Sequence, residues 1–147
     1  ARARLNLARA YAATENFKDA YTEYRRAGDL LPDDIDVQAE VGSILLLGRF
    51  FEEARERARK ILEKNPSHLA GLILLGNALA GLQDLESAVS VTERAIQASP
   101  QREGTYANLG ALLMSLGLPY EKAIGAIREA DKQATVLRSL KPGGAKA

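Results

Sequence analysis

The feature that most constrains the fold of this chain is a repeat of 34 residues. Several sets of equivalent positions keep this spacing: Pro32, Pro66 and Pro100; Ala20, Ala54 and Ala88; Phe17, Phe51 and Leu85; and Ala8, Gly42 and Gly76. In a fourth unit the register slips by one residue, because Tyr120 and Ala123 lie 35 positions after Leu85 and Ala88. We assign the extra residue to a turn at 116–119, where an insertion does least damage. A fixed period of this length indicates stacked copies of one structural unit.

Each unit has the pattern of two amphipathic helices. Large apolar residues recur at unit positions 7 and 11, and an aromatic residue or leucine at position 17 precedes a small residue at 20. Spacings of three and four place such residues on one helix face. Turn-forming residues separate the two halves, and the proline near the end of a unit stops its second helix because it removes a hydrogen-bond donor. The sequence therefore predicts an all-α fold of helix pairs.

Small residues recur where the two helices of a unit must meet. They are Ala8, Gly42, Gly76 and Gly110 in the first helices, and Ala20, Ala54, Ala88 and Ala123 in the second helices. A leucine at any of these positions would hold the pair apart. We therefore predict close helix packing at these points.

Unit three carries the pattern Leu75-Gly76-x-x-Leu79, then Leu85-x-x-Ala88, Ala95 and Pro100, which resembles the tetratricopeptide repeat. The resemblance covers roughly residues 1–134. It implies a right-handed superhelical solenoid of antiparallel helix pairs, with the first helix of each unit on the concave side. We expect units at 1–34, 35–68, 69–102 and 103–140, and a flexible tail at 141–147. The chain departs from the family at unit position 4, where the frequent tryptophan is absent.

The two ends of the solenoid differ. No proline closes unit four, so its second helix is expected to continue to Leu140 as a C-terminal cap with a polar outer face, as terminal repeats require. Unit one begins at residue 1 without a capping helix. Either its first helix is exposed, or further units precede it.

Composition excludes several classes of function. Twenty Lys and Arg against 19 Asp and Glu give a net charge of +1, which argues against a nucleic-acid-binding or anionic-lipid-binding surface. The chain has no cysteine and one histidine, so we predict no metal site, no cofactor and no enzymatic activity. The most apolar stretch, 69–82, is shorter than the roughly 20 residues that span a bilayer. Localisation stays open.

Four local motifs invite chemical interpretations, and each has a simpler explanation. Gly71, Gly76 and Gly81 lack the spacing of a phosphate loop and fit helix packing. The acidic run from Asp33 to Asp36 lacks the glycine of a calcium loop and suits the start of a helix. His68 is interpreted as solvated. The charged run at 52–63 is interpreted as a solvated face with the pairs Glu53–Arg57 and Glu56–Lys60.

The resemblance also implies a peptide-binding groove at unit positions 2, 5, 9, 12 and 13. The residues that we expect to line it are mostly small or apolar, which suits an extended or helical peptide with apolar anchors. They are Leu5, Arg9, Ala39, Ser43, Leu46, Ile73, Asn77, Ala107, Ala111 and Met114, together with Asn108 at unit position 6, where some family members carry asparagine. The carboxylate clamp of some family members is absent, because Leu5, Arg9, Glu40, Ala70 and Leu74 occupy its positions.

The sequence thus predicts a protein-binding scaffold or adaptor whose concave groove holds a peptide or a partner helix. Two other hypotheses stay open. The chain could be a regulatory or targeting segment of a larger enzyme or of a secretion or envelope assembly machine. It could instead be a module that associates with copies of itself.

Overall fold

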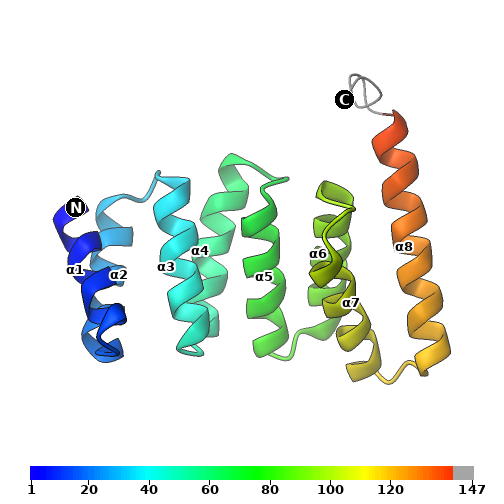
Figure 1. Cartoon of the computed structure of the whole chain (residues 1–147), viewed down its shortest axis with the longest axis horizontal. Coiled ribbons are helices and arrows are strands. Elements are labelled where there is room, and N and C mark those ends of the chain that lie inside the picture. The colour runs from blue at the N-terminus through cyan, green and yellow to red at the C-terminus, as the bar shows by residue number, and fades with distance from the viewer. Residues whose placement is uncertain (141–147) are drawn as a thin grey trace.

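The computed structural model describes residues 1–140, and all regular structure in that part of the chain is α-helical (Figure 1). The predicted flexible tail at 141–147 lies outside the described residues. The eight helices of the described part are α1 (Arg2–Ala13), α2 (Phe17–Leu30), α3 (Ile35–Leu47), α4 (Phe51–Lys64), α5 (Leu69–Gly81), α6 (Leu85–Ala98), α7 (Glu103–Ser115) and α8 (Tyr120–Leu140).

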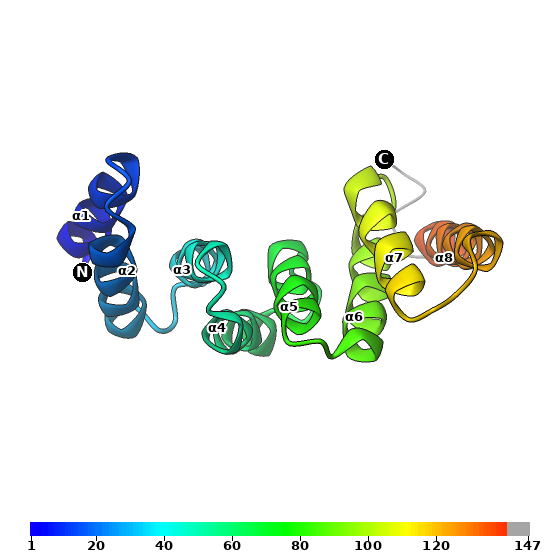
Figure 2. The same cartoon turned by 90° about the horizontal axis from the view of Figure 1, so that it is seen from below.

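The helices stack side by side along one axis, from α1 at one end to α8 at the other (Figure 1). Seen from below, α3 and α5 lie on one side and α4 lies on the other, so the first and second helices of the repeats form separate layers (Figure 2). We call the surface formed by α1, α3, α5 and α7 the first-helix face. The all-α solenoid that the repeat predicts is confirmed.

The turn inside each pair is built the same way four times. A residue with left-handed backbone stands at the same unit position, with φ of 60° at Glu15, 64° at Arg49, 63° at Gln83 and 92° at Gly117. The next residue donates its N–H to a carbonyl five residues earlier, as in Asn16 to Tyr11 at 2.8 Å. This is the hydrogen bonding of a Schellman helix end. The fourth turn then takes one more residue before α8 begins, as the shifted register predicts.

Prolines mark the ends of three second helices, as predicted. Helices α2, α4 and α6 each end two residues before Pro32, Pro66 and Pro100. Helix α8 has no such proline and runs for 21 residues, against 14 for each of those three helices. The predicted continuation of the last helix to Leu140 is confirmed.

The small residues let helices meet closely, as predicted, although one of them meets an unexpected neighbour. A Cβ added to Gly76 would lie 3.2 Å from Thr92 Oγ1 of α6, and one added to Gly110 would lie 3.0 Å from Ile127 Cδ1 of α8. A Cβ added to Gly42 would instead collide with the Leu74 side chain of the next repeat. Gly42 therefore allows α3 and α5 to approach each other across the repeat boundary.

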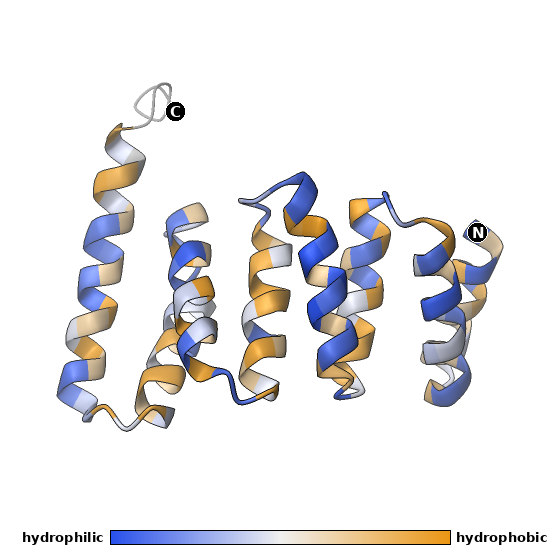
Figure 3. Cartoon of the chain, turned by 180° about the vertical axis from the view of Figure 1, so that it is seen from behind, coloured by the Kyte–Doolittle hydropathy of each residue, from blue (hydrophilic) through white to orange (hydrophobic). Residues whose placement is uncertain are grey.

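The charged run on α4 is only partly solvated, which corrects the sequence interpretation. Figure 3 shows hydrophilic residues along the outer side of the second helices, but Arg57 is 8% exposed and points inward. Its guanidinium donates to Gln38 Oε1 at 3.1 Å and to Asp29 Oδ1 at 2.8 Å. Gln38, 1% exposed, donates in turn to the carbonyls of Gly28 and Leu31 at 2.9 Å each. This network ties α2, α3 and α4 together.

The predicted pairs Glu53–Arg57 and Glu56–Lys60 are wrong for the described residues. Glu53 instead pairs with Arg25 of α2, with an Nε–Oε2 distance of 2.7 Å, and Glu56 pairs with Arg59 at 3.2 Å. Local helix spacing suggested pairs along α4, but the neighbouring helix offers a better-placed guanidinium for Glu53. The charged run therefore forms pairs both within α4 and with residues of the preceding repeat.

Candidate partner-binding surface

The first-helix face is hollowed between α3 and α5. The hollow has a volume of about 390 Å³ and is lined by Ser43, Leu46, Leu69, Ala70, Ile73, Leu74, Asn77 and Arg102. Four of these residues, namely Ser43, Leu46, Ile73 and Asn77, are among the groove residues that the sequence analysis selected. Its size lies within the range of ordinary binding pockets.

The repeat explains why these side chains meet. Ala70, Ile73 and Asn77 follow one another at spacings of three and four, so they share one face of α5. Leu46 and Ile73 are half-buried and pack against the core, which makes the floor of the hollow apolar. Leu74 is 4% exposed because it is seated on Gly42.

Polar groups lie on the walls of the hollow. The Ser43 hydroxyl donates to the Ala39 carbonyl at 2.9 Å and keeps its lone pairs free to accept. Within residues 1–140, no hydrogen bond of the Asn77 amide or of the Arg102 guanidinium is found, and Arg102 forms no ion pair there. Arg102 is the single charged residue of the lining. The hollow thus combines an apolar floor with unsatisfied donors at its edge.

Three lining residues were not predicted as groove residues: Leu74, which packs over Gly42, and Arg102 and Leu69. Arg102 lies in the connection between α6 and α7, two residues after Pro100, whereas the groove positions implied by the resemblance all lie on first helices. Leu69 is the first residue of α5. A search of the residues flanking each first helix would have found Arg102 and Leu69.

Between α1 and α3, an ion pair bridges the same face. Arg9 donates to both carboxylate oxygens of Glu40, at 2.8 and 2.7 Å. This contact raises the pKa of Arg9 and lowers the pKa of Glu40. Beneath it, burial raises the pKa of Tyr24 to about 12, and the charge of Glu40 adds to that rise. Arg9, predicted as a groove residue, is therefore paired across two repeats.

The other predicted groove residues are divided between core and surface. Leu5 is 1% exposed and belongs to the core, so its assignment to an open groove is wrong. Leu5 and Ala8 are the buried residues of α1. Ala39 is half-buried, and its carbonyl serves Ser43. The predicted residues of α7 are exposed but do not line the hollow: Ala107, Asn108, Ala111 and Met114.

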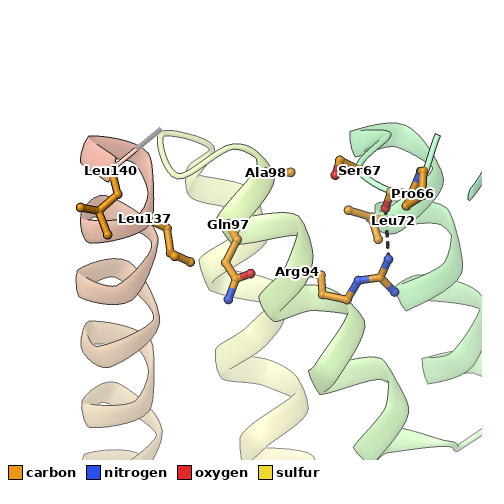
Figure 4. Close-up of a pocket in the computed structure, with 8 residues that line it drawn as sticks. All are labelled: Pro66, Ser67, Leu72, Arg94, Gln97, Ala98, Leu137 and Leu140. Atoms are coloured by element: carbon orange, nitrogen blue, oxygen red, sulfur yellow. Dashed lines mark hydrogen bonds between the residues drawn. The ribbon is translucent and has the colours of Figure 1, made fainter. Parts of the chain in front are cut away.

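A second hollow, of about 510 Å³, lies between α6 and the end of α8 (Figure 4). Arg94 donates to the Pro66 carbonyl at 3.1 Å on one side, and Leu137 and Leu140 form the opposite wall. Both leucines are exposed, at 44% and 73%. This hollow exists because α8 continues beyond the length of the other second helices.

Two of the local motifs supply helix caps. Asp34 Oδ1 accepts the Val37 N–H at 3.2 Å and caps α3, which agrees with the interpretation of the acidic run as a helix start. His68 corrects the expectation of a solvated histidine, because its Nδ1 accepts the Gly71 N–H at 3.1 Å and caps α5. Among residues 1–140, no three His, Cys, Asp or Glu side chains are grouped closely enough to hold a metal ion.

None of the eight helices within residues 1–140 combines the length and the apolarity needed to cross a bilayer.

Comparison with known families agrees with the repeat geometry. Residues 43–103 match the family model described as tetratricopeptide repeat, and these residues include α4, α5 and α6. This part of the chain is a tetratricopeptide repeat region. Outside the matched residues, the same 34-residue register and the same turn geometry continue through α1, α2, α7 and the start of α8.

Solved tetratricopeptide repeat structures share this fold. MamA 41-end from Desulfovibrio magneticus RS-1 is 18% identical, with a TM-score of 0.72 over 95% of this chain and 76% of that one. The first TPR of Spaghetti (RPAP3), bound to the HSP90 peptide SRMEEVD, is 19% identical, with a TM-score of 0.70 over 79% of this chain and 92% of that one.

One curated relative also matches. BBSome complex member BBS4 from Bos taurus is 27% identical over 106 residues. These residues are 72% of this chain, which thus spans about a fifth of the length of that relative.

Proposed function

We propose that this protein is a scaffold that holds a segment of a partner protein on its first-helix face, with the hollow between α3 and α5 as the centre of the contact. The observation that carries the proposal is that predicted groove residues from two successive repeats meet at one apolar hollow. An apolar floor favours a buried side chain, and free polar groups at the wall can orient a backbone.

Two further observations support the proposal. The exposed stripe on α7, with Met114 at 52% exposure, extends the first-helix face past the hollow. A fold neighbour, the first TPR of Spaghetti (RPAP3), is bound to a peptide in its structure.

The test uses the full chain and a displayed library of random peptides of about twelve residues. Peptides that the chain enriches are synthesised, and their Kd is measured by fluorescence anisotropy. Ala70→Arg places a long side chain in the hollow while α5 keeps a good helix former. We expect it to weaken binding at least about tenfold, a loss of about 1.4 kcal/mol.

The matched control is Ser90→Arg, at an exposed position of α6 that does not line the hollow. It adds the same side chain and should leave the Kd within about twofold. Both variants are compared with the parent chain by circular dichroism. The proposal fails if no peptide is enriched, or if Ser90→Arg weakens binding as much as Ala70→Arg does.

A further inference from the structure

The hollow between α3 and α5 has an asymmetric charge distribution. Leu46, Leu69 and Ile73 form apolar surface, and Arg102 supplies the single charge of the lining. Within residues 1–140, Arg102 forms no ion pair. The ion pairs found there involve other cations, namely Arg2, Arg4, Arg9, Arg25, Arg26, Arg55, Arg57, Arg59 and Lys64. A partner segment that brings a carboxylate can therefore pair with Arg102 without breaking an existing bond.

The backbone around Arg102 adds to this preference. Arg102 is the residue that caps the start of α7, and no side-chain hydrogen bond satisfies the first N–H groups of that helix. A helix start carries partial positive charge, which adds to that of the guanidinium. Glu103 follows in the first turn, but it is exposed and does not line the hollow.

The ion pair Arg9–Glu40 also favours binding of a carboxylate at the hollow rather than between α1 and α3. Between α1 and α3 both charges are already paired with each other, so that part of the face offers a carboxylate no free cation. At the equivalent positions one repeat later stand Ser43 and Leu74, and both line the hollow. Free positive charge and apolar surface therefore coincide only beside α5 on the described part of this face.

We propose that the hollow selects partner segments in which an apolar side chain lies within a few residues of an Asp or Glu. This inference rests on the proposed function and adds the chemistry of the partner. The apolar side chain packs on Leu46 and Ile73, the carboxylate pairs with Arg102, and the Asn77 amide hydrogen-bonds the segment backbone. A bidentate pair between a guanidinium and a carboxylate adds both energy and orientation.

The experiment compares the peptides that four versions of the full chain enrich from the same library. These are the parent chain, Arg102→Glu, Arg102→Ala and Arg128→Glu. Arg128→Glu makes the same change of charge on α8, at an exposed residue that lines neither hollow. Circular dichroism confirms that each variant is folded.

We expect the parent chain and Arg128→Glu to enrich peptides that combine apolar residues with Asp or Glu. Arg102→Ala should lose the acidic preference, and Arg102→Glu should replace it with Lys or Arg. For an acidic peptide that binds the parent, Arg102→Glu should raise the Kd at least about tenfold, and added salt should weaken binding to the parent more than to Arg102→Ala.

Three outcomes would overturn the inference. The first two would overturn it without contradicting the proposed function. If the parent enriches apolar peptides without an acidic preference, or if Arg102→Glu keeps the acidic preference, the hollow binds a partner but Arg102 does not select it. If the parent enriches no peptide, both the proposed function and this inference are wrong.

Discussion

The α1–α3 and α3–α5 parts of the first-helix face are built from equivalent positions and have different surfaces. Arg9 and Glu40 bridge the first part, and their counterparts 34 residues later are Ser43 and Leu74. The charged pair covers the surface between α1 and α3. The small hydroxyl and the leucine seated on Gly42 leave a hollow between α3 and α5. We call the part that the ion pair bridges the closed part and the part with the hollow the open part; they differ at these two positions of the repeat.

The largest expected effect concerns the close approach that shapes the open part. Gly42→Leu forces a side chain into Leu74 and should lower the free energy of unfolding by about 2–3 kcal/mol through overpacking. Urea unfolding followed by circular dichroism measures the change. Gly125→Leu is the control, because a Cβ there meets nothing within 4 Å. It should be neutral or slightly stabilising, since leucine is a better helix former. Equal losses in both variants would contradict the packing role of Gly42.

The second prediction concerns a substitution that makes the open part resemble the closed part. Ser43→Arg places at the hollow the residue type that unit one carries at Arg9. Because the added side chain occupies the binding surface, the Kd for a peptide bound by the parent should rise at least about tenfold, which is about 1.4 kcal/mol. Fluorescence anisotropy measures it, and Thr22→Arg on α2 is the exposed control. Unchanged binding to Ser43→Arg would place the partner elsewhere.

The third prediction separates stability from binding. Glu15 has a left-handed backbone at the position where unit four has Gly117, and glycine adopts that conformation without steric cost. Glu15→Gly should therefore raise the free energy of unfolding by about 0.5 kcal/mol and leave peptide binding unchanged. Thermal melting and anisotropy test the two parts. A lower melting temperature would show that the Glu15 side chain contributes more than its backbone costs.

The smallest expected effect belongs to the closed part and depends on pH. The folded state lowers the pKa of Glu40 from its usual 4.5, so the carboxylate contributes stability above that pH and loses it as the pH falls through the lower, folded value. Glu40→Gln should lower the Tm by only about 1–2 °C at pH 7, because partly exposed pairs contribute little. The difference should shrink at pH 3. A difference that grows toward low pH would contradict this sign.

The sequence predicted the elements of this fold well because they depend on local spacing. The 34-residue register located the helix pairs, the shifted fourth turn and the long α8, and it brought Ser43, Leu46, Ile73 and Asn77 to one hollow. Each of these inferences needs only the helical period and the turn residues.

The remaining features depend on contacts between residues far apart in the sequence. Leu5 was assigned to the groove because its unit position faces the partner in the resembling family, but Leu5 is buried in the core. Arg57 looked solvated within α4, yet Gln38 and Asp29 from two other helices meet it. Arg102 lies between helices, where periodicity assigns no face.

The Arg57 network has a consequence for the motions of the chain. The Arg57 guanidinium is held by α2 and α3, so α2, α3 and α4 share one set of hydrogen bonds, and α4 in turn packs on α5. In repeat proteins, local opening otherwise proceeds from the ends inward. Backbone amides of α3 and α4 should therefore exchange hydrogen with solvent slowest, and those near Leu137 and Leu140 fastest. Because α3 forms one wall of the hollow, we expect the hollow to keep its shape between encounters with a partner.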